Sequence, residues 1–274
     1  MAATELSFRN PPINEVVAGV TFAALGADGI ALLSGFWRDL ARDTFPEFQV
    51  QPPYTTTIEQ FNVNPSVPDL PGGLQFIAGY RAPRFWAVGD KGQYLLQLQP
   101  DWFACNWRRV RVDDEYYRWA QRREDFESWY RKLDHYIFEN SGQNLTPLSC
   151  EVTYINHITP TATFQAHSDY AKVFVATFGD LGLIRENFSS ALRYLVPSPG
   201  GDGPSARLHV QIDAALDGRG QQIYVLQLTA RGSPQDNSVE GVMSFLEHAR
   251  KVINDSFIAL TTADMQHDWG RTDV

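Results

Sequence analysis

The chain has 274 residues, of which 43% are hydrophobic and 20% are charged, and its formal net charge at pH 7 is −9. This composition is ordinary for a soluble globular protein, and the length suits one large domain or two domain-sized halves. The acidic balance disfavours nucleic acid as a partner, because that binding depends on Lys and Arg at phosphates, and no apolar run of about 18 residues is present to cross a membrane.

The first half of the chain, residues 11–142, combines strand patterns with two amphipathic helix patterns. The predicted elements in chain order are a strand over 15–22, a helix over 28–43, strands over 55–63 and 73–80, three short strands between 85 and 107, and a helix over 115–140. Val16, Ala18 and Val20 alternate with other residues, as in a strand with one buried face. Gly142 follows the long helix, where a left-handed residue ends a helix at little cost.

The three short strands between 85 and 107 form an aromatic-rich meander, around which the predicted fold is organised. Turn-forming residues lie at 89–92 and 100–101, and Phe103, Cys105 and Trp107 share one face of the third strand. Such a meander cannot stand alone in water, so we expect a helix to cover its apolar face.

The second half, residues 147–271, repeats this style of sequence. The predicted elements are strands over 151–158, 172–178 and 188–196, a loop over 197–204, a hairpin of strands over 207–215 and 222–230, and a final helix. Asn237 or Ser238 is expected to cap that helix, and Val242, Leu246 and Ile253 belong to its buried stripe.

The two halves resemble each other in sequence. Tyr-Leu-Leu-Gln-Leu at 94–98 is similar to Tyr-Val-Leu-Gln-Leu at 224–228, and each half ends in a long amphipathic helix. We therefore predict an α+β protein that arose by tandem duplication, in which each half is an antiparallel β-sheet covered by its C-terminal helix. Chance similarity between two strand segments is the alternative.

The order of motifs also resembles that of a sporadically distributed bacterial protein family without an assigned activity. The matching segments are 11–16 (Pro-Pro-Ile-Asn-Glu-Val), 83–86 (Pro-Arg-Phe-Trp), 95–99, 103–108 (ending Asn-Trp-Arg), 150–158 (Cys-Glu-Val-Thr-Tyr-Ile-Asn-His-Ile), Phe257, 261–262 and 269–271 (Trp-Gly-Arg). The resemblance covers nearly the whole chain and implies membership without any catalytic or ligand residues. The family's patchy occurrence resembles that of genes carried on mobile elements or in defence islands, and this likeness is an association.

The two cysteines and the start of the chain bear on location. Cys105 and Cys150 have no metal-site spacing, and we interpret them as small buried hydrophobes rather than a disulfide or a nucleophile. Glu5 and Arg9 precede any apolar segment, so no secretory signal is expected. These features predict a cytoplasmic protein.

Enzyme chemistry finds little support in the sequence. No phosphate-binding loop or His-Glu-x-x-His motif is present, so no cofactor is expected. Two groups have residue types that bind metal ions, namely His209, Gln211 and Asp213 on one strand, and His157, His167 and Asp169. A solvated sheet face and a hydrogen-bonded histidine at a strand edge are the favoured interpretations. His267 could act as a base beside a carboxylate, although a helix end with Trp269 docked on the core is favoured.

Binding makes fewer demands on the residues. Trp and Tyr side chains supply stacking surfaces, and polar residues near the join of the halves could orient a ligand. The candidate ligand-binding residues are Asn106, Trp107, Arg108, Tyr154, Asn156 and His157. The leading hypothesis is a non-enzymatic binding or interaction protein with a protein partner, an accessory of a bacterial defence or mobile-element system. The alternatives are a binder of a small molecule or nucleotide-derived ligand at the seam between the halves, and a metal-dependent hydrolase.

Overall fold

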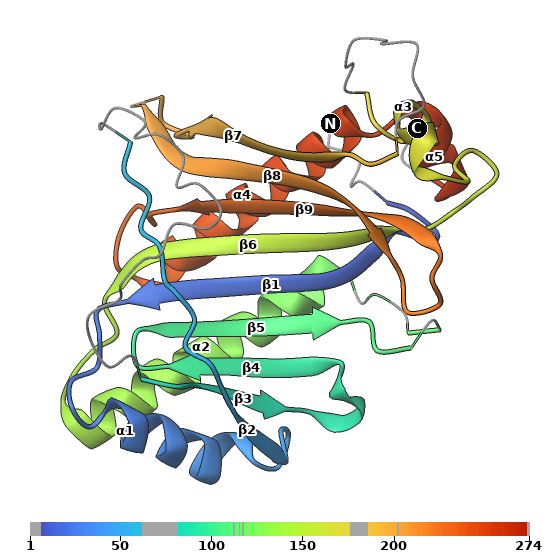
Figure 1. Ribbon diagram of the computed structural model, residues 1–274. Coiled ribbons are helices and arrows are strands. Elements are labelled where there is room, and N and C mark those ends of the chain that lie inside the picture. Colours follow the sequence, from blue (N-terminus) through green and yellow to red (C-terminus); the bar gives the residue numbers. More distant parts are fainter. Residues whose placement is uncertain are drawn as a thin grey trace.

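The computed structural model describes residues 7–61, 82–111, 113–114, Tyr116, 118–175, 186–201 and 203–272. Within them, nine strands form one continuous antiparallel sheet, in the order β2-β3-β4-β5-β1-β6-β9-β8-β7 (Figure 1). The strands in that order are β2 (Glu47–Gln51), β3 (Arg84–Val88), β4 (Tyr94–Gln99), β5 (Trp102–Arg108), β1 (Ile13–Phe22), β6 (Pro147–Ile158), β9 (Gln222–Gly232), β8 (Pro204–Leu216) and β7 (Ser189–Pro197). The α+β class and the antiparallel pairing are thus confirmed.

Two long helices lie on the same face of this sheet (Figure 1). The first, α2 (Trp119–Ser141), packs on β5, and the second, α4 (Val239–Leu260), packs on β6 and β9. The shorter helices are α1 (Gly29–Phe36), which continues as a π-helical turn over Trp37–Ala41, α3 (Tyr170–Val173) and α5 (Ala263–Asp268). In the part of the chain that the structure describes, no helix is long and apolar enough to span a bilayer.

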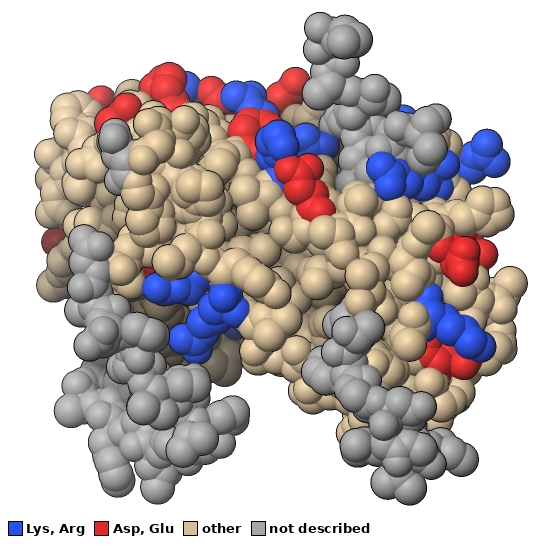
Figure 2. Space-filling view, turned by 90° about the horizontal axis from the view of Figure 1, so that it is seen from above, with Lys and Arg blue, Asp and Glu red and all other residues tan. Residues whose placement is uncertain are grey.

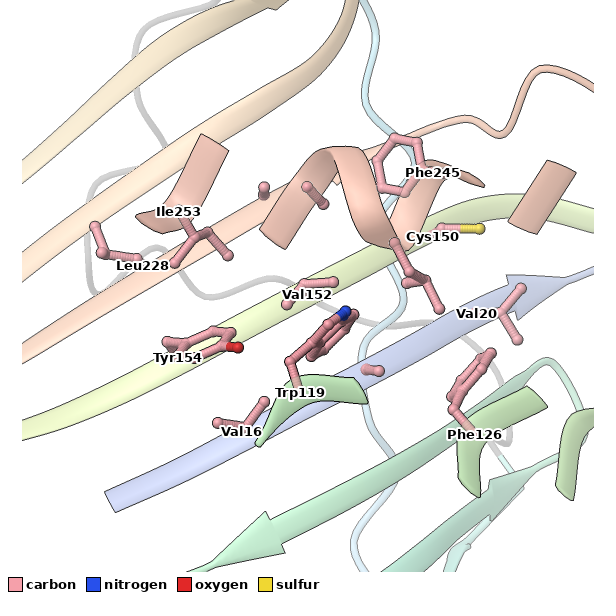
Figure 3. Packing of buried hydrophobic residues seen from close by; sticks show 14 of the residues in the cluster. Val16, Val20, Trp119, Phe126, Cys150, Val152, Tyr154, Leu228, Phe245 and Ile253 are labelled. Atoms are coloured by element: carbon pink, nitrogen blue, oxygen red, sulfur yellow. The ribbon is translucent and has the colours of Figure 1, made fainter. Parts of the chain in front are cut away.

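The core lies between the central strands and the two long helices. Alternate residues of β1 and β6, such as Val16, Val20 and Val152, point toward Trp119 and Phe126 of α2 (Figure 3). Five residues of α2 spaced by three, four or seven positions are buried, and eight residues of α4 are buried on its inner side. The helical spacing therefore matches the face that each helix presents to the sheet.

The prediction of a separate sheet for each half is wrong. The first strands of the two halves, β1 and β6, pair with each other along most of their length, with Ala18 opposite Val152. The apolar pattern of a strand shows which of its faces is buried. It does not show whether the neighbouring strand comes from the same half of the chain or from the other half. The boundaries predicted for the halves, 11–142 and 147–271, stay predictions.

The match between residues 94–98 and 224–228 does not join strands in equivalent positions. Residues 94–98 lie in β4, which pairs with β3 and β5 and is the second strand out from β1. Residues 224–228 lie in β9, which is the immediate neighbour of β6. By position, the counterpart of β9 is β5. The five-residue similarity therefore reflects two buried antiparallel strands and does not confirm the duplication.

Local sequence predictions are confirmed for most elements, with three exceptions. Residues 170–173 form α3, although a strand is predicted to begin at residue 172. No strand is predicted at the position of β2. Residues 55–61 are extended but belong to no strand. The predicted strand over 73–80 lies outside the described residues. Gly142 ends α2 with φ of 71°, and Ser238 Oγ caps α4 by accepting a hydrogen bond from the Gly241 N–H, both as predicted.

Residues 52–61, here called the strap, cross the face of the sheet opposite the long helices (Figure 1). Tyr54 stacks on Trp102 with ring centroids 4.4 Å apart, and its hydroxyl donates to Glu151 Oε1 at 3.2 Å. Further along, the Glu59 carboxylate contacts Arg207, His209 and Arg231. The strap is thus fixed to β5 and β6 at one point and to β8 and β9 at another.

Candidate functional site: a cavity between the long helices

An open cavity of about 960 Å³ lies beside the start of β1 and the end of β6, between the N-terminus of α2 and the second half of α4. We call it the junction cavity, because both halves of the chain line it. Its walls include the segment 7–14, Arg109, Tyr116, Arg118, Trp119, Tyr154, Asn156, His157, Arg250, Ile253, Asn254, Phe257 and Trp269.

A hydrogen-bonded pair of tyrosines from the two halves forms part of the wall. The hydroxyls of Tyr116 and Tyr154 lie 3.2 Å apart, and Arg250 of α4 is hydrogen-bonded to Tyr154. Burial raises the pKa of both tyrosines, so both hydroxyls stay protonated at neutral pH and can donate. Figure 3 shows Tyr154 with its hydroxyl directed toward the helix side, next to Trp119.

Trp119, the first residue of α2, is fixed by contacts with α4. Its indole Nε1 donates to Glu247 Oε1 at 2.7 Å, and the Arg250 guanidinium lies 5.9 Å from the centroid of its ring. Because α2 supplies the indole ring and α4 supplies both Glu247 and Arg250, these contacts fix the distance between the two helices at this end of the cavity.

Arg109 and His157 form a corner of the wall near the start of β1, in which Arg109 carries the positive charge. The backbone N–H of Arg109 donates to Asn14 at 2.7 Å, and that of His157 donates to Pro12 at 2.9 Å. Burial and the charge of Arg109 both lower the pKa of His157, so this ring is neutral at pH 7. Arg109 Nε is buried and has no hydrogen-bond partner among the described residues.

Most acidic groups in the wall are already engaged by backbone donors. Asp114 Oδ2 accepts from the N–H groups of Val110 and Arg111, and Asp217 Oδ1 accepts from two N–H groups of its own turn. Asp268 Oδ2 accepts from the Thr163 N–H at 3.2 Å. These hydrogen bonds, together with one from Thr161 to Asp268, lower the pKa of all three carboxyls. Each acid therefore serves to close a turn or join two segments.

The two ends of the described chain meet at the wall of the cavity. Phe8 and Arg271 form an antiparallel bridge, and the Arg9 N–H donates to the carbonyl of Gly270 at 3.1 Å. Trp269 is buried, with its ring centroid 5.3 Å from that of Phe257. The structure thus has Trp269 docked on the core, and His267 is exposed.

The structure divides the six residues predicted to bind ligand. Tyr154, Asn156 and His157 line the junction cavity, with Asn156 Nδ2 donating to the Leu226 carbonyl at 3.1 Å. Asn106 lies on the strap side of the sheet, between Gln97 and Glu15. Trp107 is buried against Tyr116, and Arg108 donates to the Gly92 carbonyl. These last three residues do not line the cavity.

The residues considered for metal binding lie apart from one another. His209 contacts Glu59, and His167 Nε2 is 2.9 Å from the carbonyl of Ile223. Asp169 accepts from the Gln165 N–H and pairs with Lys172. Within the described ranges, no three His, Cys, Asp or Glu side chains are grouped to hold a metal ion.

The candidate residues chosen from the sequence include none of Arg109, Arg250 and Asn254, which line the cavity. In the sequence, Arg250 and Asn254 stand four residues apart, next to the buried Ile253. Residues four positions apart share one face of a helix, so two polar residues beside an apolar stripe indicate a polar strip along the edge of the buried face. Arg109 belongs to a basic run that reads as a solvated strand end, yet the structure makes it half-buried.

No protein-family model, curated protein or solved structure matches this chain. The family resemblance noted from the sequence, and with it the link to defence or mobile-element systems, stays a prediction.

Proposed function

We propose that the protein is a non-enzymatic binding protein whose small-molecule ligand occupies the junction cavity. The observation that carries this proposal is the composition of the wall. Aromatic rings supplied by both halves line it together with many polar and charged groups, among them the Tyr116–Tyr154 pair and Arg250. Aromatic and apolar side chains in a ligand site supply contact area, and polar groups placed among them orient the ligand.

The size of the cavity agrees with this role. Its volume of about 960 Å³ lies near the top of the range of roughly 300–1,000 Å³ that is usual for ligand pockets. Phe257 and Trp269 are nearly buried in the described structure, so the walls are already formed. A preformed site loses less conformational freedom when its ligand binds.

A thermal-shift screen tests the proposal, because a ligand that binds only the folded state raises the melting temperature. The panel consists of nucleotides, cyclic oligonucleotides and small organic acids. Asn254→Trp places a large side chain in the cavity, and Asp255→Trp adds the same side chain at the adjacent exposed position. We expect at least one compound to raise the melting temperature of the wild type and of Asp255→Trp but not that of Asn254→Trp. Silence across the panel, or equal shifts in all three proteins, would contradict the proposal.

We also propose that the two halves arose by duplication. The support is the order of elements rather than the sequence match. In each half the first strand lies at the centre of the sheet, the last strand pairs with it, and a long helix follows that last strand. This order places β1, β5 and α2 in the same relation as β6, β9 and α4. The junction cavity then lies where the two units meet.

A protein partner is the second candidate, and β7 is the observation that favours it. This edge strand exposes Leu192, Tyr194 and Leu195, and edge strands have unpaired backbone groups that can pair with another chain. Seen from the β7 side, much of the described surface carries neither acidic nor basic side chains (Figure 2). Light scattering on the purified protein and on Leu195→Lys tests this candidate by measuring self-association through β7. The candidate requires that the wild type form an assembly and that the substitution disperse it.

A further inference from the structure

We infer that the ligand of the junction cavity is an organic anion with a planar, aromatic body, and that Arg109 binds its charged group. This inference rests on the proposed function, because it names the class of ligand for the same cavity. A carboxylate, sulfonate or phosphate monoester on a ring system has the required chemistry.

The first argument is the state of Arg109. Its guanidinium lines the cavity, and burial lowers its pKa while the charge of Asp114 raises it, with a net lowering. Even so, an arginine stays charged in a protein. A partly desolvated cation without a bonded carboxylate is unfavourable, and an anion in hydrogen-bond contact with it offsets that cost.

The second argument is that Asp114, the carboxylate whose charge acts on Arg109, is already held by other groups. Asp114 Oδ2 is held by the N–H groups of Val110 and Arg111, at 2.8 and 2.6 Å. In the part of the chain that the structure describes, Arg109 Nε donates a hydrogen bond neither to this carboxylate nor to any other residue. Among the described residues, Arg109 therefore has no carboxylate in ion-pair contact that would neutralise its charge.

The third argument is the direction of α2. Its N-terminus opens at the cavity, since Arg118 and Trp119 both line it. Arg118, at the N-cap, makes no side-chain capping bond, and the first turn has no acidic residue. The positive end of a 23-residue helix thus adds to the field of Arg109 and Arg250 at the cavity.

The fourth argument concerns the body of the ligand. Tyr116, Trp119, Tyr154 and Phe257 supply rings or ring edges to the wall, and these favour a flat apolar group. The net charge of −9 and the bounded volume of the cavity disfavour a long polyanion such as nucleic acid. The chemistry points to a compact molecule with one charged end.

Two matched probes separate the charge from the ring. 1-Naphthalenesulfonate is an anion, and 1-naphthalenesulfonamide has the same ring system without the charge. Isothermal titration of both compounds is carried out on the wild type, on Arg109→Gln and on Arg193→Gln. Arg193 is exposed on β7, which contributes no residue to the cavity, so its replacement removes the same charge elsewhere.

We expect the sulfonate to bind the wild type at least tenfold more tightly than the sulfonamide. Arg109→Gln should remove that difference while leaving the sulfonamide affinity within about twofold, and Arg193→Gln should change neither. Equal binding of both probes, unaffected by Arg109→Gln, would overturn the inference and leave the cavity as a ligand site. No binding of either probe would overturn the inference, and the thermal-shift panel with Asn254→Trp then decides separately whether the cavity binds a ligand.

A measurement on the wild type alone guards against a variant that does not fold. Raising the salt concentration screens the attraction between the anion and Arg109. The sulfonate affinity should fall several-fold between 20 and 500 mM NaCl, whereas the sulfonamide affinity should not fall. Parallel salt dependences of the two probes would contradict the role of charge.

Discussion

His209 Nε2 lies 2.7 Å from Glu59 Oε1, and this contact joins the strap to β8 across the open face of the sheet. The Glu59 side chain is only 4% exposed, and Arg207 and Arg231 contact the same carboxylate. Removing either the buried carboxylate or one of its basic partners leaves an uncompensated charge in the protein, and this lowers the free energy of unfolding. This end of the strap is therefore held by one acid rather than by backbone pairing.

Glu59→Gln should destabilise the protein by about 2 kcal/mol at pH 7, because it leaves two arginines facing a neutral amide in a partly buried site. Urea unfolding followed by circular dichroism measures the change. Glu47→Gln is the control, since Glu47 is exposed on β2 and accepts one hydrogen bond from Gln49. Equal stability of the two variants would show that the Glu59 contacts add nothing to the stability of the fold.

The stabilisation by Glu59 should depend on pH. Burial tends to raise the pKa of Glu59, but the hydrogen bond from His209 and the charges of His209, Arg207 and Arg231 outweigh it and lower the pKa below 4.5. A lowered pKa means that the stabilisation is present above pH 4.5 and is lost as the pH falls through the folded-state value. The difference in unfolding free energy between wild type and Glu59→Gln should therefore shrink below pH 4.5. A difference that stays constant down to the acid transition would be inconsistent with this linkage.

His157 should make the protein less stable in mild acid. Burial, and then the charge of Arg109, lower the pKa of this ring below 6.5, so the unfolded chain takes up a proton that the folded chain does not. Stability should fall as the pH drops from 6.5 toward the folded-state pKa. His157→Gln should lose less unfolding free energy than the wild type between pH 7.5 and 5.5, as measured by urea titrations at each pH. His135→Gln, on the exposed side of α2, should follow the wild type.

Gly232→Ala should destabilise the protein by about 3 kcal/mol or more, through overpacking between strands. A Cβ atom at this position would clash with the backbone oxygen of Ser205, where β9 pairs with β8. At Gly218, in the turn between the same strands, an added Cβ meets nothing within 4 Å. Thermal unfolding of Gly232→Ala and Gly218→Ala compares the two sites, and similar midpoints would show that the strands can separate at little cost.

The elements that sequence predicts well are those that local pattern determines. The α4 stripe, the cap at Ser238 and the left-handed Gly142 need only residues within one helix. Residues 172–175 fail because their apolar run suits a strand as well as the buried turn of α3. Phe174 instead forms an isolated bridge with Thr261, far along the chain, and that contact cannot be read from residues 172–175 alone.

The order of strands and the junction cavity depend on contacts that are distant in sequence. The pairing of β1 with β6 joins residues about 130 positions apart and is set by packing that periodicity does not encode. The cavity draws on the segment 7–14, on Arg109 and on α4, so its wall exists only after the chain ends have met. The sequence could indicate Tyr154, Asn156 and His157 as polar or aromatic residues near a seam, but not that Asn106 faces the opposite side of the sheet.

The central claim is that ligand binds in the junction cavity, and the indole N–H signals of the tryptophans test it most directly. Trp119 and Trp269 line the cavity, whereas Trp86 and Trp102 lie on the strap side, where Trp86 donates to Gln97 and Trp102 stacks on Tyr54. Each signal is assigned by a Trp→Phe variant, and the compound with the largest thermal shift is added to saturation. The account predicts that the signals of Trp119 and Trp269 move while those of Trp86 and Trp102 stay in place. Movement confined to Trp86 and Trp102 would contradict it.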